Sequence, residues 1–162
     1  MIIYKGKMKY LYFLITFTLV FSGCVTFRFW DIPEDLHIKY HSKGHLIDYE
    51  QNIEITEYTL KVNYVKPNEE RKYAPRTIKG DPMLDDIYSY IKDVDFLEKS
   101  QPIGEMLSDA PEESLTVSYD GKTKTINFGN LKDPPEYITK LRTLIFDFAT
   151  YYFPEWKHDI NQ

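Results

Sequence analysis

Three of the four histidines are spaced four residues apart: His37, His41 and His45. On a helix this spacing places the imidazoles on one face, about 6 Å apart, where they can share a metal ion. On a strand the same spacing separates neighbours by about 13 Å, which is too far for a shared ion. The alternation of Leu36, Ile38 and Tyr40 with polar residues predicts a strand, and Gly44 would interrupt a helix. We therefore expect solvent-facing histidines, with a metal site as the weaker alternative.

Acidic residues form two clusters: Asp81, Asp85 and Asp86, then Asp93, Asp95 and Glu98. The first cluster falls in the opening turns of a predicted helix, where negative charge complements the helix macrodipole. The second lacks the glycine and the alternating oxygen ligands of an EF-hand loop. The sequence also has no Gly-x-Ser-x-Gly motif, no glycine-rich phosphate loop and no His-Glu-x-x-His pair. It therefore predicts no metal ion, no cofactor and no enzymatic activity.

The single cysteine, Cys24, follows a segment with the features of a signal peptide. Three lysines form a basic head: Lys5, Lys7 and Lys9. The uncharged run 10–27 comes next, and its apolar centre, residues 11–21, has the length of a signal-peptide core and is short for a membrane span. The small residues Ser22 and Gly23 directly precede Cys24. One cysteine excludes an internal disulfide and a cysteine-rich zinc site.

This order of features resembles the lipobox signal peptide of bacterial prolipoproteins, in which small residues precede a lipid-modified cysteine. The resemblance covers residues 1–24 and implies cleavage between Gly23 and Cys24. It also implies a covalent diacylglyceryl group and an acyl chain on Cys24. These lipids would hold the protein on a bacterial cell membrane or outer membrane, with its domain on the extracytoplasmic side. An ordinary signal peptide with a chance cysteine and an uncleaved anchor helix are the alternatives.

Cleavage would change both the length and the charge of the chain. The full sequence has 162 residues, with 20 basic and 25 acidic side chains and a net charge of −5. Loss of residues 1–23 removes three lysines and no acid, which leaves 139 residues with a net charge of −8. Such a chain lacks the basic stripe that meets phosphates, so we expect no nucleic-acid partner. The expected segments are a signal peptide (1–23), a lipid-anchored tether or first strand (24–35) and a single domain (36–162).

Hydrophobic periodicity predicts strands over residues 36–41, around 53–55, over 58–65 and over 71–79. The apolar residues change from odd to even positions near Thr56 and Glu57, a phase slip that indicates either a β-bulge or two separate strands. The Asp120-Gly121 turn predicts a hairpin that pairs Leu115 with Ile126 and Val117 with Lys124.

Helices are predicted over residues 82–94, with Asp81 as N-cap, and from residue 136 to about 152, with Asp133 as N-cap. The segment 95–113 is expected to be a long loop with one helical turn at 103–107. The order of strands, helix, hairpin and helix predicts an α+β fold, with a small, mainly antiparallel sheet and two helices packed on one face.

Residues 58–148 also resemble, in their pattern of elements, the emfourin-like metalloprotease inhibitors of prokaryotes. The likeness rests on Leu115-Thr116-Val117, on the Asp120-Gly121 turn, and on Pro135 ahead of Leu141 and Leu144. Three functions are therefore open. The leading one is a lipid-anchored, non-enzymatic envelope protein that binds a protein or another envelope component. The alternatives are a lipid-anchored metalloprotease inhibitor and an envelope enzyme without a recognisable motif.

Overall fold

The computed structural model describes residues 31–44, 48–67 and 69–156 of the chain. In chain order the strands are β1 (His37–Lys43), β2 (Glu50–Thr56), β3 (Thr59–Lys66), β4 (Glu69–Lys72), β5 (Arg76–Thr77), β6 (Glu112–Tyr119) and β7 (Lys122–Asn127). The helices are α2 (Pro82–Asp93), the short 3-10 helix η1 (Phe96–Glu98) and α3 (Glu136–Tyr152).

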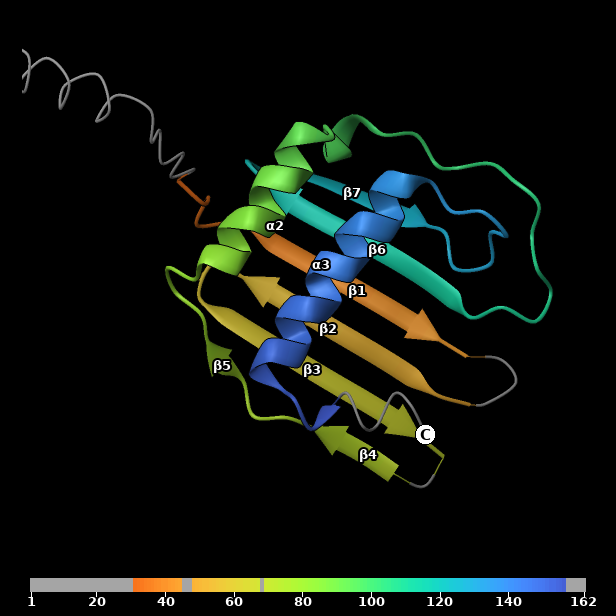
Figure 1. The fold of residues 1–162 in the computed structure, drawn as a ribbon, viewed down its shortest axis with the longest axis horizontal. Coiled ribbons are helices and arrows are strands. Elements are labelled where there is room, and N and C mark those ends of the chain that lie inside the picture. Colours follow the sequence, from red (N-terminus) through yellow and green to blue (C-terminus); the bar gives the residue numbers. More distant parts are fainter. Residues whose placement is uncertain (1–30, 45–47, 68, 157–162) are drawn as a thin grey trace, which may run out of the picture.

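The strands form one antiparallel sheet in the order β4-β3-β2-β1-β6-β7, and β5 also pairs with β3. Both helices, α2 and α3, lie on the same face of this sheet (Figure 1). The predicted α+β fold, with two helices on one face of a small antiparallel sheet, is confirmed. The opposite face carries the polar residues of the alternating strands.

The core consists of two rows of side chains that cross the sheet and face the helices. Strand pairing aligns Leu60, Ile55, Ile38 and Val117 in the first row, and Val62, Ile53, Tyr40 and Leu115 in the second. All eight residues are almost fully buried. The helices cover them with apolar stripes, which include Ile87 and Ile91 of α2 and Leu141 and Ile145 of α3. Burial of these apolar side chains is the main stabilising contribution to the fold.

The phase slip near Thr56 separates two strands, so the β-bulge alternative is wrong. Ile55 of β2 pairs with Leu60 of β3, and the pairing continues without an extra residue to Glu50 and Val65. The Thr56 hydroxyl oxygen accepts a hydrogen bond from the Thr59 backbone N–H at 3.0 Å, which closes the turn between them. A threonine can replace a backbone acceptor in this way within a tight turn.

The segment 71–79 forms two short pieces of strand, β4 and β5, where one strand is predicted. Both pair with β3, and they are separated by residues 73–75. Pro75 has no N–H to donate to the ladder, which explains the interruption. Both pieces lie along the outer side of β3, at the edge of the sheet. Residues 31–35 precede β1 as a turn, so no strand forms there, and the rest of the predicted 24–35 segment lies outside the described residues.

Helix α2 begins as predicted, because the Asp81 carboxylate accepts a hydrogen bond from the Met83 backbone N–H at 2.8 Å. The prediction of Asp133 as the cap of α3 is wrong. Pro135 occupies the N-cap position, and no side chain caps the helix. Asp133 and Pro134 each precede a proline, which disfavours helical backbone angles at both positions. The helix can therefore begin only after Pro135.

The helical turn predicted at 103–107 is also wrong. The short helix of this loop is η1, at Phe96–Glu98. Phe96 is fully buried and packs against the ring of Tyr137, whereas Ile103 is 99% exposed. Met106 instead forms an isolated β-bridge with Leu131. The loop therefore folds where it can bury a large side chain, since one turn of helix has little stability of its own.

The β6–β7 hairpin has the predicted register, with Leu115 opposite Ile126 and Val117 opposite Lys124. Asp120 and Gly121 adopt positive φ angles of 51° and 69°, as a two-residue turn of this kind requires. The Asp35 carboxylate accepts hydrogen bonds from the backbone N–H groups of Asp120 (3.1 Å) and Gly121 (2.8 Å). These bonds lower the pKa of the Asp35 carboxyl and tie the start of β1 to the hairpin tip.

We expect the variant Asp35→Asn to melt at a lower temperature than the wild type at pH 7. The folded pKa of Asp35 lies below the unfolded value of about 3.9, so its stabilising effect is present above that pH. The effect is lost as the pH falls through the folded pKa, and the two melting temperatures should then converge. Thermal melts followed by circular dichroism from pH 7 to pH 2 test this. Asp31→Asn is the control, and an equal effect of both variants would contradict the role of Asp35.

Candidate functional site

The structure places His37 and His41 on strand β1, on the sheet face opposite the helices. The strand prediction for this segment is confirmed, since Ile38, Tyr40 and Ser42 are buried and the residues between them are more exposed. The Nδ1 atom of His41 lies 3.0 Å from the Asn52 amide oxygen and 3.7 Å from a Glu50 carboxylate oxygen. No group of three metal-ligating side chains occurs among the described residues.

Three other predicted site residues, Gly23, Cys24 and His45, lie outside the described residues. The acidic clusters fall on and beside α2, where Asp81 serves as the helix cap. Of the residues singled out for chemistry in the sequence, His41 lies beside a small hollow that Glu112, Ser114 and Asn127 also line.

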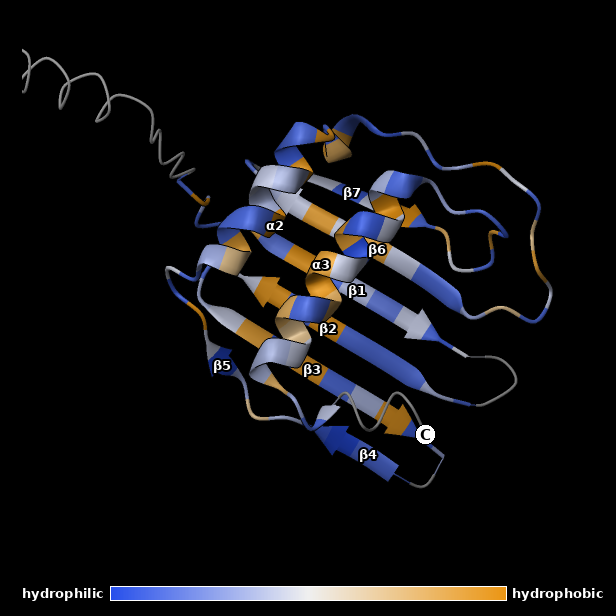
Figure 2. Ribbon diagram, in the orientation of Figure 1, coloured by the Kyte–Doolittle hydropathy of each residue, from blue (hydrophilic) through white to orange (hydrophobic). Residues whose placement is uncertain are grey.

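A third row of side chains crosses the helix-facing side of the sheet, and this row is polar. Strand pairing aligns Tyr64 with Gln51, Gln51 with Ser42, and Ser42 with Glu113, across β3, β2, β1 and β6. We call these four residues the polar row. Its members lie near one end of their strands, next to the two apolar core rows, and the ends of β2 and β6 there are hydrophilic (Figure 2).

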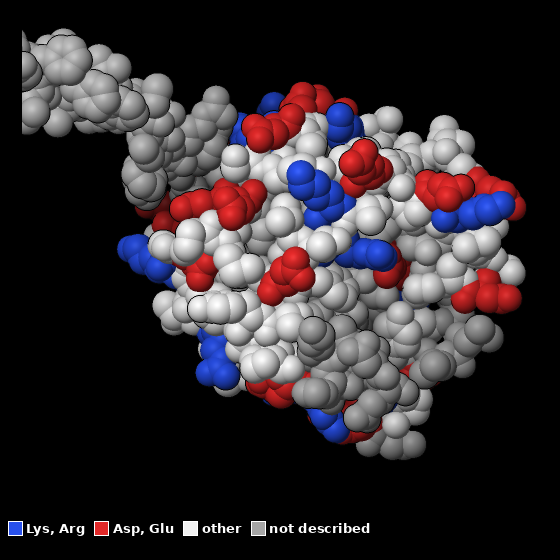
Figure 3. Space-filling model, viewed as in Figure 1, with Lys and Arg blue, Asp and Glu red and all other residues white. Residues whose placement is uncertain are grey.

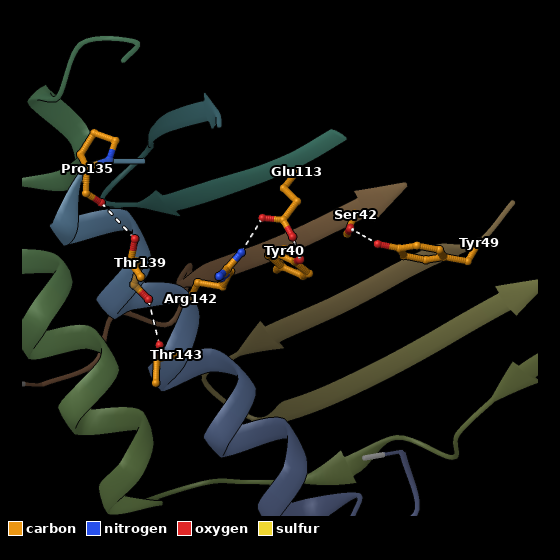
Figure 4. A network of polar contacts seen from close by, with 8 residues as sticks. All are labelled: Tyr40, Ser42, Tyr49, Glu113, Pro135, Thr139, Arg142 and Thr143. Carbon is orange, nitrogen blue, oxygen red and sulfur yellow. Dashed lines mark hydrogen bonds and ion pairs between the residues drawn. The ribbon is translucent and has the colours of Figure 1, made fainter. Parts of the chain in front are cut away.

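Glu113 is the charged member of the polar row, and its side chain is only 12% exposed. Arg142 of α3 donates a hydrogen bond from Nη1 to Glu113 Oε2 at 2.7 Å, and the Tyr40 hydroxyl donates to Oε1 at 2.8 Å (Figure 4). Burial and the adjacent carboxylate both raise the pKa of Tyr40. Tyr40 therefore stays protonated at neutral pH and serves as a hydrogen-bond donor.

The polar row forms one wall of a cavity of about 610 Å³. The other lining residues are Tyr40, Tyr49, Lys66, Arg142, Thr143 and Phe146. This volume is within the range of roughly 300–1,000 Å³ that small-molecule sites occupy. On the same face of the molecule, acidic side chains of the described residues form small groups, some of them beside basic side chains (Figure 3).

Some polar groups of this cavity have hydrogen-bond partners among the described residues, and others have none. The Ser42 hydroxyl lies 3.3 Å from the Tyr49 hydroxyl, and the Thr143 hydroxyl donates back to the Thr139 carbonyl at 3.0 Å. Gln51 is 4% exposed, and its Nε2 atom has no hydrogen-bond partner among the described residues. Lys66 makes no ion pair with another described residue, and its ammonium lies 5.4 Å from the centre of the Tyr64 ring. The cavity therefore offers donors to a bound molecule.

The sequence alone does not point to the residues of this candidate site. One signal was present: Ser42 and Gln51 continue the inward positions of Ile38–Tyr40 and Ile53–Ile55, where an apolar residue is expected. Ser42 and Gln51 lie next to each other, and Ser42 next to Glu113, only because β1 pairs with β2 and β6. Glu113 is 71 positions after Ser42 in the sequence, so local pattern contains no sign of their contact.

No protein-family model matches this chain, and no curated protein shows significant similarity to it. Among the residues that the structure describes, no helix is both long and apolar enough to cross a membrane.

We expect Arg142→Met to destabilise the fold by about 2 kcal/mol, because it leaves the buried Glu113 carboxylate without its cation. Glu113→Gln keeps an acceptor oxygen for the Arg142 guanidinium, and its amide NH2 can donate to the Tyr40 hydroxyl, so this variant should cost less, about 1 kcal/mol. The double variant should cost less than the sum of the two single variants. Urea unfolding of the four proteins measures each value and the coupling.

The matched control is the exposed pair of Lys132 and Glu105, whose charged atoms are 2.9 Å apart. Lys132→Met should change the free energy of unfolding by less than about 0.5 kcal/mol. If Arg142→Met is no more destabilising than Lys132→Met, or if the double variant is additive, the ion pair of Arg142 with Glu113 does not have the structural role assigned to it.

Proposed function

We propose that this chain is a lipid-anchored bacterial envelope protein whose folded domain faces the extracytoplasmic side and binds an envelope component or partner through the cavity beside the polar row. The anchor rests on the order of basic head, short apolar run, Ser22-Gly23 and Cys24 in the sequence. Two acyl chains attached to one cysteine supply the double signal that stable membrane attachment needs. The observation that carries the binding role is the cavity, with its buried but incompletely paired polar wall.

Binding fits the chemistry of this cavity better than catalysis does. Its carboxylate, Glu113, already accepts hydrogen bonds from Arg142 and from Tyr40. The raised pKa of Tyr40 keeps its proton in place at neutral pH, so this hydroxyl is a donor and a poor base. The groups that are left to meet a ligand are the amide of Gln51, the ammonium of Lys66 and the aromatic rings. These groups recognise and orient molecules.

The position of the cavity relative to the chain entry supports this proposal. The chain enters the domain through residues 31–36, at the start of β1, while Ser42 of the polar row lies near its end (Figure 1). Ser42 follows Leu36 by six positions, which is about 20 Å at the usual rise of a strand. With Cys24 held at a membrane, the cavity lies at the end of the sheet opposite the tether. A ligand could then reach it from the side away from the lipid.

A second candidate function is inhibition of a metalloprotease. The order of strands, α2, the β6–β7 hairpin and α3 is the pattern on which the resemblance to emfourin-like inhibitors rests. This order supports the candidate, and the domain would then act on a protease near the membrane to which Cys24 attaches it.

We expect labelled fatty acid to be incorporated into the wild-type chain and not into Cys24→Ser when each is expressed in a bacterium. The thiol of Cys24 is the acceptor of the diacylglyceryl group, and serine offers no thiol. Gel fluorography after labelling, with membrane and soluble fractions separated, measures both lipidation and attachment. Ser22→Ala preserves a small residue before the cysteine and serves as the control. Equal labelling of the wild type and Cys24→Ser would refute the anchor.

The inhibitor candidate predicts that the purified protein at micromolar concentration slows a thermolysin-like metalloprotease acting on a small fluorogenic peptide. An inhibitor occupies the active-site cleft, so the rate should fall as inhibitor concentration rises and recover on dilution. Heat-unfolded protein serves as the control for competition by an ordinary substrate. An unchanged rate at ten micromolar folded protein would eliminate this candidate.

A further inference from the structure

We propose that the cavity beside the polar row binds a small organic monoanion, with a carboxylate attached to a flat apolar body. This proposal rests on the proposed role of the cavity as a binding site, and it does not depend on the lipid anchor. Three features of the cavity carry it: the balance of charge, the unpaired amide of Gln51 and the arrangement of aromatic rings.

The charge balance of the cavity favours one negative charge on the ligand. Two cations, Arg142 and Lys66, line the cavity together with one carboxylate, Glu113. Arg142 is engaged with Glu113 at 2.7 Å, so these two charges offset each other. Lys66 is left as the cation without an ion-pair partner among the described residues. A monoanion would complete the balance, whereas a dianion such as a phosphate ester would bring a second negative charge beside Glu113.

Gln51 supplies a buried donor on the same wall. Its side chain is almost fully buried, and its Nε2 atom has no hydrogen-bond partner among the described residues. A buried polar group without a partner costs roughly 1–3 kcal/mol, so such groups are nearly always paired in native proteins. This atom has almost no accessible surface, so the amide must turn toward the cavity before a carboxylate oxygen of the ligand can accept its hydrogen bond. Gln51 is aligned with Tyr64, and the Lys66 ammonium lies over the Tyr64 ring. The Gln51 amide and the Lys66 ammonium are therefore two donors in the same region of the cavity.

Aromatic rings form the apolar part of the lining. The rings of Tyr49 and Tyr64 are 6.1 Å apart, with an angle of 35° between their planes. The rings of Tyr40 and Phe146 are 5.0 Å apart and meet edge to face. Aromatic side chains bind flat apolar groups through stacked and edge-to-face contacts. The ligand body that best matches these walls is an aromatic ring or another flat apolar group.

The test compares matched pairs of acid and amide on the full-length protein in detergent micelles. The probes are 3-phenylpropanoate with 3-phenylpropanamide, indole-3-acetate with indole-3-acetamide, and 2-naphthoate with 2-naphthamide; phenyl phosphate is the dianionic probe. Saturation-transfer NMR detects binding, and isothermal titration calorimetry at low salt gives the affinities. We expect at least one acid to bind about tenfold more tightly than its amide, which is the effect of one charge-assisted hydrogen bond. Phenyl phosphate should bind more weakly than that acid.

Three variants locate the binding. Lys66→Gln and Gln51→Leu should each remove most of the preference for the acid. Lys79→Gln should leave it unchanged, because Lys79 also lies over a tyrosine ring, that of Tyr58 at 5.3 Å, but does not line the cavity. Circular dichroism melts establish that each variant is folded before it is titrated.

Each outcome decides a different part of the proposal. If acid and amide bind equally, or if Lys66→Gln keeps the preference, the monoanion assignment is overturned while the cavity remains a binding site. If phenyl phosphate binds most tightly, the single-charge assignment is overturned. If none of the probes binds the folded wild type, both the ligand class and the binding role of the cavity are overturned, and the labelling of Cys24 is unaffected by that result.

Discussion

The ion pair between Arg142 and Glu113 determines how helix α3 can lie on the sheet. A carboxylate that is 12% exposed needs a cation and hydrogen bonds, because the loss of its hydration is otherwise very costly. Arg142 supplies both from α3, next to Leu141, which is fully buried in the core. A rotation of the helix about its axis would therefore expose the apolar stripe and remove the cation from Glu113 at the same time. Apolar packing and charge pairing specify the same position of the helix.

The cavity is a consequence of this arrangement. Two helices cover the two apolar rows of the sheet, and the polar row lies next to these rows, where Arg142, Thr143 and Phe146 of α3 line the cavity with it. Its members partly satisfy one another, as the hydroxyls of Ser42 and Tyr49 do at 3.3 Å. They leave the Nε2 atom of Gln51 without a hydrogen-bond partner among the described residues. An apolar row in this place would leave a flat, uncovered apolar surface, which soluble domains avoid unless it serves as an interface. A polar row permits an open cavity with a fixed set of donors.

Predictions from the sequence succeeded where the residues that determine an element all lie within one short segment. The strand at Leu36–Tyr40, the Asp81 cap and the pairing of Leu115 with Ile126 all follow from side-chain alternation or from one turn. The cap at Asp133 failed although it is local, because two successive prolines restrict the backbone more strongly than a carboxylate can favour the cap. The turn predicted at 103–107 failed because Phe96, outside that segment, is the residue that the core accommodates.

The candidate site was not predictable from short segments, since Ser42, Gln51 and Glu113 meet only when β1 pairs with β2 on one side and β6 on the other.

The acidity of the chain bears on the size of the ligand that this cavity can accept. The full sequence has a net charge of −5, and acidic side chains are spread over the face that carries the helices. A polyanion would meet these charges along its whole length, and at physiological salt they act over about 8 Å. A small anion bound as we propose would lie among the side chains that line the cavity, and the charges of Arg142, Lys66 and Glu113 sum to +1. Inside a partly closed cavity this local charge is screened less than the surface charges are. An acidic domain can therefore select small anions and exclude large ones, provided that the excess positive charge lies inside the cavity and the negative charge lies outside it.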